Sequence, residues 1–238
     1  MENKKFLGVI PARSGSKGIK NKNIRSFCGK PLLAHTIVKA KRSKYLDRVL
    51  VSTDSEEYAK MSLTHWAEVP FLRPKYLSSD NSLIADVIVH LLGKLEEQEG
   101  YKPDYVVLIQ TTSPLSTHKD IDACIEAVMN SECDGVMTMV PRESLLYTTD
   151  KNGYLKLLYN KDWLEKTNRQ SVPRTYQING PAVVIASVES FLKNKSFLAG
   201  KIFPVFMEKW RSVDLDTEED FLLAELIYKN RKMFERRV

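Results

Sequence analysis

The chain has 238 residues, 43% of them hydrophobic, which predicts a single domain, 1–238, with a full core. Three cysteines without a CxxC spacing argue against a disulfide framework and a zinc site, and the lack of an apolar membrane span or a signal peptide predicts a cytoplasmic protein with no membrane partner. The formal net charge is +6. Residues 4–44 contain twelve Lys and Arg and no acid, so the positive electrostatic field belongs to this N-terminal stretch, which carries the first motif.

The first predicted element is a buried strand that leads directly into a basic loop. Residues 6–10 are apolar, and Pro11 ends the strand because its nitrogen cannot donate to the ladder. In the loop, Gly15 and Gly18 let backbone N–H groups face inward. Hydroxyls and charges that suit a triphosphate surround these glycines: Arg13, Ser14, Ser16, Lys17 and Lys22. The spacing is not the Walker pattern, which disfavours a kinase or GTPase, and the alternative is a solvated turn.

The next segments alternate between helix and strand. The sequence predicts a helix over 31–42 and a strand over 48–52. The capping-box spacing of residues 54–57 favours Asp54 as a helix cap over Asp54 as a metal ligand. A short strand over 68–71 and an amphipathic helix over 83–97 follow.

The most continuous apolar run, residues 105–109, predicts a central strand of the sheet. It ends in Gln110, Thr112 and Ser113, whose side chains both donate and accept hydrogen bonds and so suit the hydroxyl and amide groups of a sugar. The alternative is that Thr112 and Ser113 satisfy the backbone of the turn, and we expect this of at least one of them. Thr117 then begins a helix.

The strand-helix alternation stops after a strand predicted over 134–140. Asn152 and Gly153 predict a hairpin turn between residues 145–147 and 154–157. An exposed hairpin with this much apolar surface predicts an interface, and therefore a two-fold homodimer. Its apolar residues are Leu145, Leu146, Tyr147, Tyr154, Leu155, Leu157, Leu158 and Tyr159.

A polar motif follows the hairpin. Arg169 is suited to clamp a carboxylate with two parallel hydrogen bonds. For Tyr176 and Asn179 the alternatives to a ligand contact are a packed ring and a turn. Strands are predicted over 181–186 and 202–206.

The last motif carries two aspartates. In an extended segment Asp214 and Asp216 project to the same side, as carboxylates that hold a hard cation such as Mg²⁺ do. Thr217 and Asp220 predict a capping pair for the final helix. The residues predicted to pack inward from that helix are Phe221, Leu222, Ala224, Leu226 and Ile227.

These motifs resemble those of the CMP-sialic acid synthetases, or N-acylneuraminate cytidylyltransferases, which include the legionaminate and pseudaminate enzymes. The similar stretches are residues 10–23, 110–115, 168–180 and 211–220. The resemblance implies an α/β fold of the nucleotidyltransferase type, with a mostly parallel sheet flanked by helices. It also implies that residues 142–178 form a dimerisation insertion that completes the partner's sugar site.

The same resemblance implies transfer of CMP from CTP to the anomeric hydroxyl of a nonulosonic acid, N-acetylneuraminate first, with Mg²⁺ as cofactor. Arg13, Lys17 and Asp216 would take part in the chemistry. The nucleotide site would comprise Ala12, Arg13, Ser14, Gly15, Ser16, Lys17, Lys22, Asn23, Arg73 and Asp80. The sugar site would comprise Gln110, Thr112, Ser113, Arg169, Gln170, Tyr176 and Asn179, and the metal site Asp214 and Asp216.

Two alternatives stay open. The nearest is the same chemistry on legionaminate or pseudaminate. The other is a non-catalytic protein that binds nucleic acid through residues 4–44, which the acid-free run supports. That stretch offers few aromatic residues for stacking, and a nucleic-acid binder leaves the two-aspartate motif and Gln110 unexplained, so we expect no nucleic-acid partner.

Overall fold

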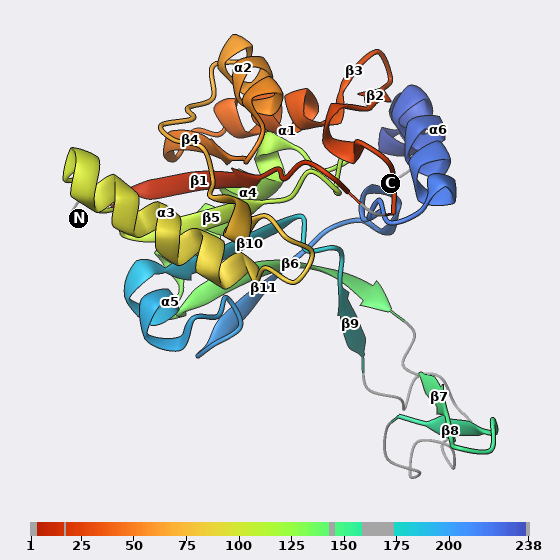
Figure 1. The fold of residues 1–238 in the computed structure, drawn as a ribbon. Helices are drawn as coiled ribbons and strands as arrows, with labels where there is room; N and C mark the ends of the chain where they lie inside the picture. Colours follow the sequence, from red (N-terminus) through yellow and green to blue (C-terminus); the bar gives the residue numbers. More distant parts are fainter. Residues whose placement is uncertain (1–3, 17, 143–145, 159–173, 237–238) are drawn as a thin grey trace.

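A seven-stranded sheet forms the centre of the computed structural model, which describes residues 4–16, 18–142, 146–158 and 174–236 (Figure 1). The strand order is β11-β6-β10-β5-β1-β4, and β9 pairs with β6 beyond this path. The strands are β1 (Phe6–Pro11), β4 (Leu46–Ser52), β5 (Tyr105–Ile109), β6 (Gly135–Arg142), β9 (Thr175–Ile178), β10 (Val183–Ser187) and β11 (Ile202–Phe206).

Most strands of this sheet run in one direction. β1 pairs in parallel with both β4 and β5, and β11 pairs in parallel with β6. β10 is antiparallel to β5 and β6, and β9 is antiparallel to β6. The predicted mostly parallel sheet is therefore confirmed, and the carboxyl ends of β1, β4 and β5 meet at one edge, where open α/β sheets bind ligands.

Helices cover both faces of the sheet (Figure 1). α1 (Leu32–Lys41), α2 (Glu56–Thr64) and α4 (His118–Asn130) pack on one face, and α3 (Ile84–Glu99) and α5 (Val188–Asn194) pack on the other. Alternate residues of β1 divide between the two cores, with Ile10 on the α1 side and Val9 on the α3 side. Both sheet faces are buried, which explains why the strand sequences are apolar without alternation.

α6 (Glu218–Glu235) forms a third core with the small hairpin of β2 (Ser26–Phe27) and β3 (Lys30–Pro31). The predicted cap is confirmed, because Thr217 and Asp220 form a reciprocal capping box. Only part of the predicted inward face is buried: Leu222 and Leu226 are 59% and 62% exposed. α6 packs at the end of the fold through one narrow stripe, which consists of Phe221, Ala224 and Ile227.

The predicted hairpin projects from the body of the protein as β7 (Tyr147–Thr149) and β8 (Leu155–Leu157) (Figure 1). Gly153 adopts a φ of 85° in its turn, and the Asp150 carboxylate accepts N–H groups of the same turn. Within the described residues, 147–149 pair with 155–157, and the predicted hairpin residues Leu145 and Tyr159 lie outside the described residues. Within the predicted insertion, residues 175–178 are β9 and so belong to the main sheet.

The structure corrects two further local predictions and adds two elements. Residues 68–71 form a single bridge between Glu68 and Leu50 instead of a strand. The cap of α2 is Ser55, whose hydroxyl accepts the N–H of Tyr58, and not Asp54. Neither α5 nor the β2–β3 hairpin was predicted. Within the described residues, no helix combines the length and apolar character needed to cross a membrane.

Candidate active site

The basic loop after β1 is fixed to the neighbouring strand end. The N–H of Ala12, which is buried, donates to the carbonyl oxygen of Ser52 at 2.9 Å. The N–H and hydroxyl of Ser14 donate to the carboxylate of Asp54 at 2.8 and 2.6 Å. Burial acts to raise the pKa of Asp54, but the hydrogen bonds from Ser14 outweigh it and hold the pKa below its ordinary value. Asp54 therefore anchors the loop.

Asn23 connects the same loop to the end of β5. Its side chain is buried, its Nδ2 donates to the carbonyl oxygen of Arg13 at 3.0 Å, and its Oδ1 accepts from the hydroxyl of Thr111 at 2.8 Å. Both ends of the amide are occupied by the protein. Asn23 thus supports the loop, and its predicted contact with the nucleotide stays a prediction.

Two arginines flank the loop in different environments. Arg13 is partly exposed, and its Nη2 lies 2.6 Å from Oδ1 of Asp80. Arg73 is buried, and its guanidinium donates to the hydroxyl of Ser52 at 3.1 Å and to the carbonyl oxygen of Ser52. Burial lowers the pKa of Arg73 to about 10, although the nearby Asp54 acts to raise it. Gly15 is exposed and Ser16 is half-buried on the loop between them.

The turn after β5 contains both accessible and buried polar groups. Gln110 and Thr112 are half-buried, and the Thr112 hydroxyl lies 3.4 Å from Oε1 of Gln110. Ser113 is buried and its hydroxyl lies 3.4 Å from the carbonyl oxygen of Asn179. Asn179 is buried too: its Oδ1 accepts from Thr138 and its Nδ2 donates to Ser212. Ser113 and Asn179 support the turn in this structure, and their predicted sugar contacts are untested.

The other residues predicted for the sugar site are Tyr176, Arg169 and Gln170. Tyr176 is partly exposed on β9, and its ring packs against Phe206 with 4.6 Å between centroids. Lys17, Arg169 and Gln170 lie outside the described residues, so the roles predicted for them rest on the sequence alone.

The two-aspartate segment lies directly against the basic loop. Nζ of Lys22 donates to the carbonyl oxygen of Leu215 at 2.6 Å, and a Cβ on Gly18 would lie 2.5 Å from the carbonyl oxygen of Asp216. On its other side, the N–H of Leu215 donates to the carbonyl oxygen of Thr112 at 2.9 Å. Burial lowers the pKa of Lys22, against the charges of both aspartates. Three motifs that are far apart in the sequence therefore meet at the edge formed by the carboxyl ends of β1, β4 and β5.

Asp214 has the environment of a cation ligand. Its Oδ1 atom is buried and has no hydrogen-bond partner among the described residues. Burial and the charge of Asp216 raise its pKa, although Thr112 and the charge of Lys22 act to lower it. A buried carboxylate oxygen without a donor needs a positive partner. The carboxylate also rests on Gly180, where a Cβ would lie 2.4 Å from Cγ of Asp214, a constraint that the sequence did not reveal.

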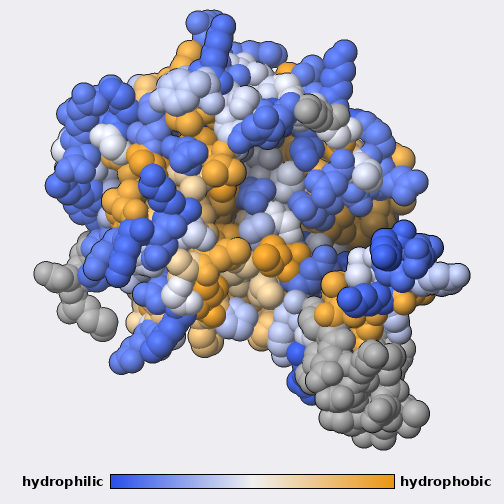
Figure 2. All heavy atoms as spheres, turned by 60° about the horizontal axis from the view of Figure 1, so that its bottom comes forward, coloured by the Kyte–Doolittle hydropathy of each residue, from blue (hydrophilic) through white to orange (hydrophobic). Residues whose placement is uncertain are grey.

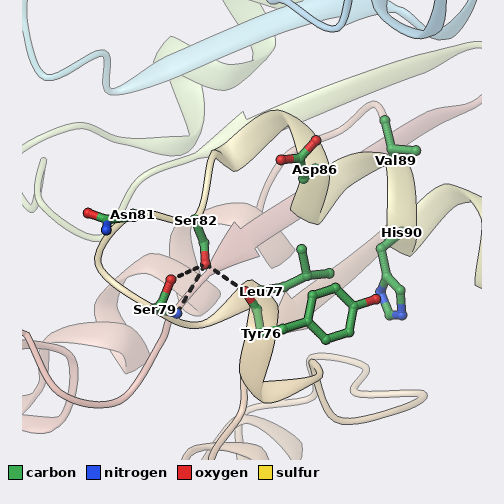
Figure 3. A pocket seen from close by; sticks show the side chains of 8 residues that line it. All are labelled: Tyr76, Leu77, Ser79, Asn81, Ser82, Asp86, Val89 and His90. Carbon is green, nitrogen blue, oxygen red and sulfur yellow. Dashed lines mark hydrogen bonds between the residues drawn. The ribbon is translucent and has the colours of Figure 1, made fainter.

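A separate pocket of about 550 Å³ lies between residues 76–82 and α3 (Figure 3). Ser82 organises the loop that bounds it, since its hydroxyl donates to the carbonyl oxygen of Tyr76 and accepts the N–H of Ser79. The pocket shares no residue with the predicted site. We place the candidate active site at the sheet edge, because the charged groups converge there. The pocket is lined by Tyr76, Leu77, Ser79, Asn81, Ser82, Asp86, Val89 and His90.

Comparisons with known proteins cover nearly the whole chain. The family model described as "Cytidylyltransferase" matches residues 7–234. "Post-translational flagellin modification protein B" of Campylobacter coli is 32% identical over 96% of this chain and 97% of its own length. "CMP-N,N'-diacetyllegionaminic acid synthase" of Legionella pneumophila is 33% identical over 93% of this chain and 95% of its own. "N-acylneuraminate cytidylyltransferase" of Streptococcus agalactiae is 34% identical over 92% of this chain and 52% of its own.

Among solved structures, the chain is similar to the CMP:2-keto-3-deoxy-manno-octonic acid synthetase complexed with CTP. The TM-score is 0.68 at 14% identity, over 95% of this chain and 99% of that one. At so low an identity the likeness shows the fold alone, and that fold is the predicted one.

Proposed function

This chain belongs to the cytidylyltransferase family, and we propose that it transfers CMP from CTP to the anomeric hydroxyl of a nonulosonic acid, with N-acetylneuraminate as the first candidate. In this reaction the anomeric oxygen bonds to the α-phosphorus, and the bond from that phosphorus to the β-phosphate oxygen breaks, releasing pyrophosphate. The contact of the basic loop with the two-aspartate segment carries the proposal, because it brings phosphate-binding and metal-binding groups together.

The basic loop would bind the triphosphate. Arg13, Lys17 and Lys22 supply positive charge, and the charge that develops on the phosphoryl oxygens makes these contacts stronger in the transition state than in the ground state. The partly exposed side chain of Arg13, which already pairs with the carboxylate of Asp80, supports its assignment to an anionic ligand. Ser14, which is tied to Asp54, keeps the loop backbone in place.

We propose Mg²⁺ as the cofactor, with Asp214 and Asp216 as its ligands. The buried, unpartnered oxygen of Asp214 supports the assignment. Among the described residues no three acidic, His or Cys side chains form a metal cluster, so water and phosphate oxygens would complete the ligand set. When bound, the ion supplies charge stabilisation at the α-phosphate and lowers the pKa of the attacking hydroxyl. The chain holds the two carboxylates through Leu215, between Thr112 and Lys22.

The identity of the sugar is the finer part of the proposal. Relatives of similar identity are named for acylneuraminic and legionaminic acids, so legionaminate and pseudaminate stay alternatives. Gln110 and Thr112 are the half-buried polar groups next to the metal segment, and we assign them to the sugar. Binding of nucleic acid has no support beyond the basic stretch, and the cytoplasmic location stays a prediction.

Turnover with a panel of sugars tests the proposal. The enzyme is incubated with CTP, Mg²⁺ and either N-acetylneuraminate, a legionaminate, a pseudaminate or 2-keto-3-deoxy-manno-octonate, and pyrophosphate release is measured. We expect release with at least one nine-carbon acid and the highest kcat/KM with N-acetylneuraminate. Activity confined to legionaminate or pseudaminate would leave the reaction standing and correct the sugar. No release with any nine-carbon acid would contradict the proposed function.

We also propose a two-fold homodimer in which the insertion of each chain packs on its partner. Exposed apolar side chains on the projecting arm support it: Leu146, Tyr147, Tyr154, Leu155 and Leu158. Figure 2 shows hydrophobic residues among hydrophilic ones on this arm, at the lower right. A closed two-fold arrangement is the commonest way to cover such a surface. Arg169 would then serve the sugar site of the partner.

Mixing two inactive variants tests this arrangement. Lys17→Ala and Arg169→Ala proteins are unfolded, combined and refolded, and heterodimers with distinguishable tags are isolated. If Arg169 acts in the partner's site, each heterodimer regains one site with both residues and about half of the activity of a wild-type site pair. Heterodimers without activity would place Arg169 in its own chain's site. A sedimentation mass near 27.3 kDa at assay concentration, the mass of one chain, would contradict the proposed dimer.

A further inference from the structure

Lys39 is a buried amine on α1 beneath the turn that follows β5. Its side chain is 7% exposed, and its Nζ donates to the carbonyl oxygen of Ser113 at 3.0 Å and to the hydroxyl of Ser116 at 2.6 Å. Neither acceptor is charged. Within the described residues Lys39 forms no ion pair, which is unusual for a lysine with so little contact with water.

The turn that Lys39 holds leads to the metal segment. The Ser116 hydroxyl accepts from Lys39 and donates to the carbonyl oxygen of Ser113 at 2.8 Å, which closes a small buried network. The preceding residue, Thr112, accepts the N–H of Leu215 through its carbonyl oxygen. Leu215 lies between Asp214 and Asp216 in the sequence, so this hydrogen bond fixes the backbone that carries both aspartates. The Lys39 network and the contact with the aspartate segment therefore lie on adjacent residues, Ser113 and Thr112.

The charged groups around Lys39 do not compensate its burial fully. Burial lowers the pKa of Lys39 to about 7, and Asp120 on α4 acts to raise it. Asp120 is already engaged, since its carboxylate caps α4 and lies 2.5 Å from Nη1 of Arg211. His35, one turn earlier on α1, has its own pKa lowered by burial first, and the charge of Lys39 contributes. An apolar side chain at position 39 would avoid the free-energy cost of burying a charged amine.

We propose that Lys39 is a positioning residue for CMP transfer: its amine fixes the Ser113–Ser116 turn so that Thr112 and Asp214 keep their places in the active site. This inference rests on the proposed function. The ammonium has three N–H donors and the neutral amine has two, so both protonation states make the two observed hydrogen bonds. Small displacements at a reacting centre lower the rate by up to about 100-fold, which is why the turn needs such an anchor.

The experiment compares Lys39→Met, Lys39→Gln and the control Lys41→Met, an exposed lysine of the same helix. Methionine matches the shape without donors, whereas glutamine is neutral and keeps two N–H donors. We measure kcat and KM for CTP and for the preferred sugar by pyrophosphate release, and Tm at pH 6 and pH 9. In Lys39→Met we expect kcat to fall at least tenfold with KM for CTP unchanged. Lys39→Gln should recover part of the loss, and Lys41→Met should match the wild type.

The melting temperatures separate positioning from a structural role. The pKa of Lys39 is about 7 in the folded protein and near 10.5 when unfolded, so between these values the unfolded chain binds more protons and the stability of the wild type rises with pH. At pH 6 the charged amine is buried at a cost, and Lys39→Met should melt no lower than the wild type. The difference in Tm between Lys39→Met and the wild type should be smaller at pH 9. A merely structural lysine would instead lower Tm on removal and leave kcat of the folded fraction intact.

Each outcome decides the inference. Values of kcat and KM within twofold of the wild type in Lys39→Met would overturn it, and so would failure of both Lys39 variants to fold, which would make Lys39 structural only. A wild type that releases no pyrophosphate with any nonulosonic acid would instead overturn the proposed function, and the inference with it. An active wild type next to an unaffected Lys39→Met would overturn the inference alone.

Discussion

Replacing Asp214 or Asp216 by Asn should remove Mg²⁺-dependent CMP transfer while leaving the fold intact. Each change keeps the shape of the side chain and takes one negative charge from the proposed metal site. A bound metal contributes several kcal/mol to the stabilisation of transition-state charge, so we expect kcat/KM to fall at least about 100-fold. Asp214 is partly buried and Asp216 is exposed, so neither loss opens a cavity.

Asp214→Asn should lose activity without losing stability when no metal is present. Burial and the charge of Asp216 raise the pKa of Asp214, so the folded protein holds the proton more tightly than the unfolded chain, and the contribution of Asp214 to stability falls as pH rises through its raised pKa. Above that raised pKa and without metal, the carboxylate is therefore ionised at a cost in stability. Asp214→Asn should melt at the same temperature as the wild type or higher under these conditions. With Mg²⁺ and CTP present the order should reverse, because only the wild type gains the binding energy.

The control for these variants is Glu219→Gln, an exposed acid in the first turn of α6. It removes the same charge from the same region without touching the two carboxylates. Activity is measured over a range of Mg²⁺ concentrations, and Tm with and without Mg²⁺ and CTP. If Asp214→Asn and Asp216→Asn respond to Mg²⁺ as the control does, the two aspartates are structural residues of a turn and the metal lies elsewhere.

Local patterns predicted the elements whose signal lies within one stretch of sequence. The apolar runs gave β1 and β5, and the Thr117 and Thr217 caps gave the starts of α4 and α6. These patterns were less informative where packing against other elements decides which residues are buried. Leu222 and Leu226 have the right spacing for an inward face, yet α6 lies at the end of the fold and buries only one stripe. A pattern of residues does not say how much of a helix its neighbours cover.

The site shows the same division. Strand ends predicted the places of the basic loop and the Gln110 turn, because parallel strands end together, but they did not place the two aspartates at the same edge. The contacts that hold them could not be predicted: Lys22 and Leu215 are 193 positions apart, and Asp54 has the spacing of a cap but binds Ser14. Asn179 and Ser113 carry side chains suited to a sugar, and their burial and their contact with each other were not predicted. A polar residue type indicates hydrogen bonding without saying with which group.

Replacing Gly180 by Ala should damage the metal site more than the fold. Gly180 has a φ of 85°, which disfavours other residues by about 1–2 kcal/mol, and its Cβ would lie 2.4 Å from Cγ of Asp214. Two atoms cannot approach so closely, so the carboxylate must move away from its position opposite the basic loop. We expect a fall in kcat of at least about tenfold, since displacements near 1 Å have this effect, and a higher Mg²⁺ concentration for half-maximal activity.

Gly100→Ala separates the backbone strain of this variant from its clash. Gly100 ends α3 with a φ of 63°, but nothing lies within 4 Å of its Cβ position. Both variants should therefore lose stability to the left-handed conformation, whereas only Gly180→Ala should lose Mg²⁺-dependent activity. Measuring Tm and the Mg²⁺ dependence of pyrophosphate release for the two proteins side by side checks this. If Gly180→Ala keeps the Mg²⁺ dependence and kcat of Gly100→Ala, the carboxylate of Asp214 has a second productive position, and its contact with Gly180 does not set the geometry of the site.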